Sequence, residues 1–434
     1  MAREWLGRAG SLPLSIQIYR DLRSTSSRAS NFEFLYPLCD LIKAYSGRWR
    51  SLELRTVPRS LLRRLLVNLY DSPVPCLHYL RLEQSNFKAD RADEHPLDLM
   101  TLSPNTFHSN IPHSSFSIQW QALAHLTLTS PYPIRKFLSI LLEARQIIQC
   151  NAQLSTIEEP SKSYDDDDED LPGLKDLPEG FPSEQNPLSC GAMQELRLHF
   201  DELVDDSNDD GPPHYLFTRI VTPELERLQI YYPEQAYFDS SLADPISTLI
   251  LRSKCSLKCF NLQGVRFCHE SEDQLVRILE LMPSVENLNI FVDSNDDNDG
   301  GLTDHFFHQA SLDHGHCPIL EELKKFEYNG PRNFSWERFS DYFCIGTTEG
   351  SQERSRVLKM IAVSLAKRDE GLMDERTMWR LWYANSWCRV FDCDDSSVSL
   401  IAKYRHADEE ERACLRMVYI RYIPDWLLEE YGDN

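Results

Sequence analysis

PELERLQI, residues 223–230, is the stretch on which the fold prediction rests. Two other stretches follow the same template, PCLHYLRL at 75–82 and PSVENLNI at 283–290. The template reads proline, any residue, an apolar residue, two polar or mixed residues, leucine, any residue and an apolar residue. Leu228 and Ile230 flank the polar Gln229, and this alternation is typical of a strand with one buried face.

Weaker copies of the template occur along most of the chain, at 49–54, 123–128, 193–198, 257–262, 320–326 and 358–363. The central apolar positions of all copies are Leu52, Leu80, Leu126, Leu196, Leu228, Phe260, Leu288, Leu323 and Ile361. By subtraction, successive positions are 28, 46, 70, 32, 32, 28, 35 and 38 residues apart. The shorter steps lie at or just above the range of leucine-rich repeats, and the two longest predict insertions.

Helices are expected between these strands. Apolar residues recur at helical spacing in 60–70, 134–149 and 273–282, and Pro283 ends the last of these stretches. The alternation of strand and helix predicts the fold class α/β, as a curved leucine-rich-repeat solenoid (horseshoe) with irregular repeats and inserted loops. A doubly wound α/β domain is the alternative, but its central strands are usually continuous apolar runs, and no Gly-rich nucleotide loop occurs in this sequence.

The repeat pattern divides the chain into three parts. We expect an N-terminal capping segment over 1–45, the repeat region over 46–365, and a C-terminal helical tail or cap over 366–434. Glu158 to Asp170 holds eight acidic residues against one lysine, so about 155–187 is predicted to be an acidic disordered insertion. In the tail, Trp379, Trp382 and Tyr383 have helical spacing, which favours an apolar face docked on the last repeat over an exposed binding hot spot.

Five stretches carry a family resemblance: WLGRAGSLPLSIQI at 5–18, GRWRSLEL at 47–54, the strands at 75–82 and 223–230, and FSWERF at 334–339. They resemble the region that follows the F-box in large fungal families of F-box/leucine-rich-repeat proteins, over about residues 5–365. The resemblance implies a substrate receptor that works with a Skp-type adaptor and a cullin in a ubiquitin ligase. The F-box itself would precede Trp5, where the sequence has four residues. The expectation is therefore a module that was lost, a gene model that starts late, or a protein that binds partners without a ligase.

Charge and cysteine content narrow the function classes. The sequence has 45 basic and 68 acidic residues, a formal net charge of -23, which disfavours binding to nucleic acid or to a membrane surface. A solubilising surface explains this charge best, and a partner with a basic face is the second explanation. The 12 cysteines are dispersed, and neither a signal peptide nor a membrane-spanning run is found, so a cytoplasmic or nuclear protein is expected.

The candidate partner-binding residues are polar and lie between the strand leucines, so they point away from the core onto the concave face. They are Glu53, Arg81, Thr127, Arg197, Gln229, Asn261 and Asn289. The sequence has no Gly-x-Ser-x-Gly elbow, Walker loop or His-Glu-x-x-His motif, so we predict a protein that is not an enzyme, with no catalytic residue, cofactor or metal. A loop-based hydrolase is the alternative, and it would need a pocket with perturbed histidines or carboxylates.

Two possible metal sites are weighed and set aside. Asp-Ser-Asn-Asp-Asp occurs at 206–210 and 293–297, and 295–300 fits the first half of a calcium loop, but its twelfth position is Phe306 instead of glutamate. These loops are predicted to be solvated, or to form an acidic rim. Zinc bound by Cys255, Cys259, Cys268 and His269 is less favoured than buried cysteines, because structural zinc sites show tighter paired spacing. The histidines at 305, 308, 314 and 316 are expected to face solvent.

Overall fold

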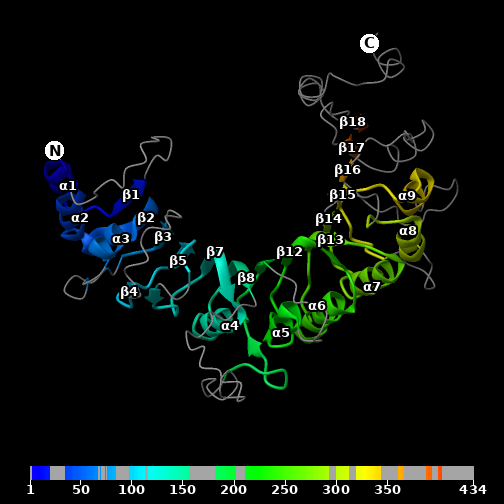
Figure 1. The fold of residues 1–434 in the computed structure, drawn as a ribbon, viewed down its shortest axis with the longest axis horizontal. Coiled ribbons are helices and arrows are strands. Elements are labelled where there is room, and N and C mark those ends of the chain that lie inside the picture. Colours follow the sequence, from blue (N-terminus) through cyan, green and yellow to red (C-terminus); the bar gives the residue numbers. More distant parts are fainter. Residues whose placement is uncertain are drawn as a thin grey trace, which may run out of the picture. The chain divides into compact units, whose positions relative to one another are not determined.

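The computed structural model describes two compact units. Its described residues are 2–19, 35–66, 69, 74, 76–84, 97–112, 116–155, 181–201, 211–292, 300–311, 319–343, 360–365, 388–392 and 399–402. Unit 1 comprises 1–201 and 219–223, and unit 2 comprises 202–218 and 224–434. Each unit alternates strands with helices, as the ribbon in Figure 1 shows.

Unit 1 is built around a parallel sheet in which the order of the strands follows the chain, β1-β2-β3-β5-β7-β8-β10. The elements of this unit are α1 (Ala2–Arg8), β1 (Leu14–Tyr19), α2 (Tyr36–Lys43), the 3-10 turn η2 (Ser46–Arg48), β2 (Trp49–Val57), α3 (Arg59–Leu66), β3 (Tyr79–Gln84), β4 (Leu97–Leu99), β5 (Thr106–Ser109), β6 (Phe116–Ile118), β7 (His125–Pro133), α4 (Ile134–Glu143), β8 (Gln149–Ser155), β9 (Leu188–Ser189), β10 (Glu195–Phe200) and β11 (Ile220–Val221). The pairs β4–β6 and β9–β11 form two small parallel sheets beside it.

Alternating apolar residues supply the core of unit 1. Leu52 and Leu54 of β2 pair with Leu80 and Leu82 of β3, and all four side chains are buried. The intervening positions are half-buried or exposed. The sheet therefore has one face turned to the core and one polar face, as the period-2 pattern predicts.

Unit 2 repeats this plan with longer helices. Its elements are α5 (Pro212–Phe217), β12 (Arg227–Tyr237), α6 (Ser240–Ser253), β13 (Cys259–Arg266), α7 (His269–Glu280), β14 (Asn287–Phe291), α8 (Asp304–Ser311), β15 (Lys325–Gly330), α9 (Trp336–Phe343), β16 (Met360–Leu365), β17 (Cys388–Asp392) and β18 (Ser399–Ala402). Strands β12 to β17 pair in parallel in chain order, and β18 pairs with β17 in antiparallel orientation. Helices α6, α7, α8 and α9 pack in succession, each against the next (Figure 1).

A glycine allows two strands of unit 2 to approach closely. The pairing of β12 with β13 is irregular after Tyr231, and Gly264 lies in this region with a φ of 78°. A Cβ on this residue would lie 1.6 Å from the carbonyl oxygen of Tyr232. Both the left-handed backbone and the lack of space therefore require glycine here.

The same capping contact joins α7 to α8 and α8 to α9. Glu272 of α7 accepts hydrogen bonds from the backbone N–H and the hydroxyl of Thr303, which precedes α8. Asp304 of α8 accepts the equivalent bonds from Ser335, which precedes α9. The hydroxyls of Thr303 and Ser335 in turn accept from backbone N–H groups in the first turn of their own helices, those of His305 and Arg338. The starts of α8 and α9 are thus each fixed by a carboxylate from the preceding helix. That carboxylate accepts from a backbone N–H that would otherwise lack a partner.

The stretch FSWERF has a structural role in this unit. Phe334, Trp336 and Phe339 are buried at the start of α9. The rings of Phe334 and Phe339 stack with centroids 5.2 Å apart, and Phe307 of α8 lies edge-on to both. Aromatic packing of this kind explains why bulky residues are needed at this junction.

The predicted curved leucine-rich-repeat solenoid is wrong, and the fold is corrected to an α/β architecture built on a large parallel sheet. This class of layered folds includes Rossmann-like and TIM-like domains. Two compact units replace the single solenoid, and the connections between strands differ in kind. Helices connect some neighbouring strands. In the sequence, however, the short strand β4 comes between β3 and β5, and the short strand β6 comes between β5 and β7. The leucine template detects half-buried strands and carries no information about how they are joined, so it could not distinguish a solenoid from this architecture.

Element positions also differ from the prediction in detail. Strands β5 and β8 occupy parts of the steps of 46 and 70 residues, in which insertions but no further strand were expected. The helix expected over 134–149 ends at Glu143, and its last predicted residue begins β8. The first 45 residues contribute β1 to the sheet, and the described parts of 366–434 are the strands β17 and β18. Most of the acidic insertion, the residues 156–180, lies outside the described residues. Among the described helices, none combines the length and the apolar character that a membrane crossing requires.

Candidate binding face

Strand register aligns one polar residue from each strand of unit 1 into a continuous row on the face opposite the core. Adjacent members are paired across neighbouring strands, about 4.8 Å apart in the hydrogen-bonding direction. We name this set the polar row; its members are Gln17, Glu53, Arg81, His108, Thr127, Asn151 and Arg197.

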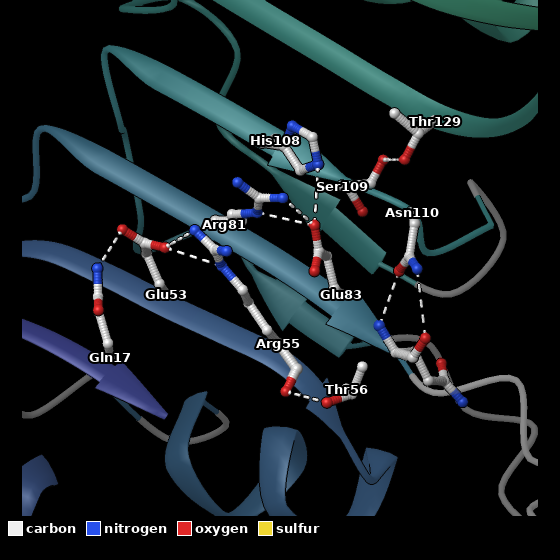
Figure 2. A network of polar contacts seen from close by, with 11 residues as sticks. Gln17, Glu53, Arg55, Thr56, Arg81, Glu83, His108, Ser109, Asn110 and Thr129 are labelled. Carbon is white, nitrogen blue, oxygen red and sulfur yellow. Dashed lines mark hydrogen bonds and ion pairs between the residues drawn. The ribbon is translucent and has the colours of Figure 1, made fainter. Parts of the chain in front are cut away.

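Glu53 lies between two donors in this row. Gln17 Nε2 donates to its Oε1 at 2.8 Å, and Arg55 donates to its Oε2 at 2.6 Å (Figure 2). Burial alone would raise the pKa of Glu53, but the hydrogen bonds from Arg55 and Gln17 hold that pKa below its ordinary value. The carboxylate is therefore kept charged and oriented.

Arg81, Glu83 and His108 form a second linked group (Figure 2). Arg81 Nε donates to Glu83 Oε1 at 2.8 Å, and His108 Nε2 lies 3.3 Å from the same oxygen. Burial, together with the positive charge of Arg81, lowers the pKa of His108 despite the nearby carboxylate. All three side chains are no more than 24% exposed, so their charges interact through a medium less polar than water.

Hydrogen bonds between side chains and the backbone connect β3, β5 and β7. The amide of Asn110 accepts from the backbone N–H of Gln84 at 2.7 Å and donates to its carbonyl at 3.3 Å (Figure 2). Thr129 Oγ1 donates to the carbonyl of Ser109 at 3.4 Å. These side-chain contacts hold β3, β5 and β7 in register at the ends of β3 and β5 and in the middle of β7, so the polar row rests on a defined backbone.

A shallow hollow of about 390 Å³ adjoins the row. Three of its lining residues, Tyr19, Arg55 and Glu83, are aligned with one another across β1, β2 and β3. Tyr19 is 73% exposed, and the Arg55 side chain is 44% exposed. An exposed aromatic ring beside an arginine at the edge of a hollow has the composition of an interaction hot spot.

Unit 2 presents a corresponding row of different chemistry. Gln229, Asn261, Asn289 and Glu327 are paired in register across β12 to β15. Gln263 donates to Asn261 at 3.2 Å, and Lys325 donates to Glu327 at 2.6 Å. Asn289 Oδ1 is buried and has no hydrogen-bond partner among the described residues.

The structure thus places every predicted partner-binding residue on a polar strand position. Glu53, Arg81, Thr127 and Arg197 belong to the row of unit 1, and Gln229, Asn261 and Asn289 belong to that of unit 2. Arg197 pairs with Glu195 of its own strand instead of facing solvent alone. The role of these residues in binding stays a prediction.

Sequence reasoning missed Gln17, His108 and Asn151. Their strands lack the leucine pair of the template, since β5 reads TFHS and β8 reads QCNAQLS. All three strands, β1 included, nevertheless alternate more exposed with more buried positions, so a search for period 2 without leucine would have found these residues.

The structure describes only some of the cysteines, histidines and tryptophans that the sequence singled out. Cys255 and Cys259 are half-buried, whereas Cys268 and His269 are exposed, so buried cysteines account for only part of that group. Of the predicted solvent-facing histidines, His308 is exposed and His305 is half-buried. Both Asp-Ser-Asn-Asp-Asp stretches, the histidines at 314 and 316, and the tryptophans at 379, 382 and 387 lie outside the described residues.

Comparison with known proteins adds no relative. No family model matches the chain, and no curated protein matches its sequence.

Proposed function

We propose that this protein is a non-catalytic scaffold that binds another protein through the polar face of unit 1. The observation that carries the proposal is the unbroken polar row with the hollow beside it. Interfaces gain specificity from charged groups that are already oriented before the partner binds. Glu53, Arg81 and Glu83 are each oriented by hydrogen bonds to neighbouring side chains. The hollow provides a place for one anchoring side chain of the partner.

The class of partner follows from charge and shape. A partner with a basic surface is the one that electrostatic attraction to a chain of net charge -23 would select, although a solubilising surface also explains that charge. A row of side chains on consecutive strands suits an extended polypeptide segment that crosses the strands. From the resemblance to F-box proteins, we propose that the scaffold is the substrate-receptor part of a ubiquitin ligase, joined to a Skp-type adaptor and a cullin, in the cytoplasm or nucleus.

Affinity capture from cells tests this proposal with a matched pair of baits. One bait carries Tyr19→Ser with Arg55→Ser, which removes the aromatic ring and the cation at the hollow. The control bait carries Tyr237→Ser with Arg145→Ser, which removes the same exposed chemistry from positions outside the hollow. We expect wild type and control to recover the same partners, and the first bait to lose them.

Two results would contradict the proposal. Equal recovery by both double variants would exclude the hollow as the binding site. Recovery of neither a Skp-type adaptor nor a cullin, together with a reproducible hydrolytic activity of the purified chain, would exclude the receptor and favour the loop-based hydrolase. Recovery of adaptor and cullin with the wild-type bait supports the receptor.

A further inference from the structure

Two histidines and a glutamate meet where α7 and α8 begin. His269 is the first residue of α7, Glu272 follows one turn later, and His305 is the second residue of α8. One potential ligand atom from each of the three lies within 4.8 Å of those of the other two. His269 Nδ1 lies 3.9 Å from Glu272 Oε2, and the two imidazole rings are 5.2 Å apart, nearly perpendicular.

The capping contact accounts for Glu272 but not for the histidines. Glu272 and Thr303 at the α7–α8 junction correspond to Asp304 and Ser335 at the α8–α9 junction, which makes the same hydrogen bonds. Counted from these pairs, the positions that match His269 and His305 are Gly301 and Glu337. The second junction is therefore capped without any imidazole. Helix capping alone gives no reason for two histidines to converge on the first carboxylate.

Glu272 differs from a surface acid in its surroundings. Its side chain is 0% exposed, whereas the His269 side chain is 76% exposed and that of His305 is 28% exposed. The cluster therefore has a buried anionic end and an open end through which an ion can enter. A buried carboxylate is costly unless it is hydrogen-bonded, paired with a cation or bound to a metal.

Asp273 provides the contact that usually supports a ligating histidine. Its Oδ1 lies 2.7 Å from His305 Nε2. Metal-bound histidines commonly donate their second ring N–H to a carboxylate, which fixes the tautomer and the ring orientation. With Nε2 held in this way, Nδ1 of His305 is the nitrogen left for an ion.

We infer that His269, Glu272 and His305 bind a divalent transition-metal ion, with Asp273 as the positioning residue for His305. Two imidazoles and one carboxylate form a donor set that suits zinc and leaves a further coordination position for water. Ligand atoms 2.0–2.2 Å from a tetrahedral ion lie about 3.3–3.6 Å from one another. Since the ligand atoms lie within 4.8 Å of one another, the longest separation closes by at most about 1.5 Å on binding.

The ion would act as a clip between successive helices. His269 and Glu272 come from α7 and His305 comes from α8, so one ion ties two elements whose nearest ends, Glu280 and Asp304, are 24 positions apart in the sequence. An ion that binds only the folded arrangement raises the unfolding temperature, and the increase grows with the logarithm of the free ion concentration above the dissociation constant. The expected property is thus zinc-dependent stability of unit 2.

Calorimetric titration of the full chain with Zn²⁺ tests this inference, followed by Co²⁺ titration read by visible absorption. The test variant is His269→Ala with His305→Ala. The control is His78→Ala with His308→Ala, which removes two exposed histidines outside the cluster. We expect wild type and control to bind one ion more than the test variant, and the cobalt complex of that site to lack a thiolate charge-transfer band.

Two single variants separate binding from folding. Glu272→Gln retains an oxygen that accepts from Thr303 and removes the charge, so it should fold and bind Zn²⁺ more weakly. Asp273→Asn should weaken binding by about 10–100-fold, the usual effect of losing a carboxylate behind a ligating histidine. Equal ion stoichiometry and affinity in the wild type and the double histidine variant, with unchanged circular dichroism, would overturn the inference. So would a cobalt spectrum dominated by thiolate ligands and insensitive to Glu272→Gln.

Discussion

The polar faces of the two units share a backbone plan and differ in chemistry. In unit 1 the row contains Glu53, Arg81 and His108, and each contacts a neighbour on the same face. In unit 2 the matching row consists mainly of amides, and the Oδ1 atom of Asn289 is left without a partner among the described residues. Half-buried charges must be compensated, whereas amides tolerate partial satisfaction at lower cost. The face of unit 1 is therefore rigidly organised, and that of unit 2 keeps hydrogen-bonding capacity free.

The largest expected effect disrupts unit 2 alone. Gly264→Ala places a methyl group against the carbonyl of Tyr232 and forces a side chain onto a backbone with φ of 78°. We expect a loss of about 2–5 kcal/mol in the free energy of unfolding, measured by urea denaturation. Gly191→Ala in unit 1 is the control, because its Cβ would meet nothing within 4 Å. Equal effects of the two substitutions would show that the close approach at Gly264 does not constrain the fold.

A smaller loss of stability is expected when a half-buried charge on the face of unit 1 is left without its partner of opposite charge. Glu83→Ala removes the shared partner of Arg81 and His108, both of which are largely covered. We expect a loss of about 1–2 kcal/mol in unfolding free energy. Gln263→Ala, two residues after Asn261 as Glu83 is two after Arg81, should cost less than about 0.5 kcal/mol. Both values come from urea denaturation, and a reversed order would contradict the comparison.

The smallest effect is a dependence on pH that arises in unit 1. Burial lowers the pKa values of His108 and His199, so the folded chain binds fewer protons than the unfolded chain just below the ordinary histidine pKa of about 6.5. Stability should therefore fall as the pH drops from 6.5 through the lowered pKa values, by at most about 1.4 kcal/mol per pH unit for each histidine.

Thermal unfolding between pH 5 and 7.5 measures this dependence. His108→Gln should flatten the curve, whereas His308→Gln on an exposed position of α8 should leave its slope unchanged. A slope that is the same in wild type and in His108→Gln would assign the pH dependence to other groups.

The leucine pattern predicted individual strands well and their assembly poorly. The alternation around Leu80 and Leu228 identifies both strands and the outward direction of Arg81 and Gln229, because period 2 is a local property. It does not show that β5 and β8 intervene, since Phe107 and Cys150 replace leucine at their centres. Nor does it show two units or the kind of connection between strands, because these depend on contacts between distant residues.

The convergence of His269 and His305 was also beyond the reach of the sequence. Thirty-six positions separate the two residues, and only the packing of α7 against α8 brings them to one carboxylate. The zinc site weighed from the sequence included His269, but its other ligands were Cys255, Cys259 and Cys268 instead of Glu272 and His305.

The carboxylate caps between helices give unit 2 a direction. The start of α8 depends on Glu272 of α7, and the start of α9 depends on Asp304 of α8, so these two helices each rely on the one before. A truncation that removes α9 leaves the start of α8 capped, whereas one that removes α7 takes away the carboxylate that holds Thr303, the capping residue of α8. Loss of an earlier helix should therefore weaken the start of the next one, whereas loss of a later helix should leave the earlier cap intact. In a chain growing from its N-terminus, the carboxylates that hold the starts of α8 and α9 have been made before those helices form.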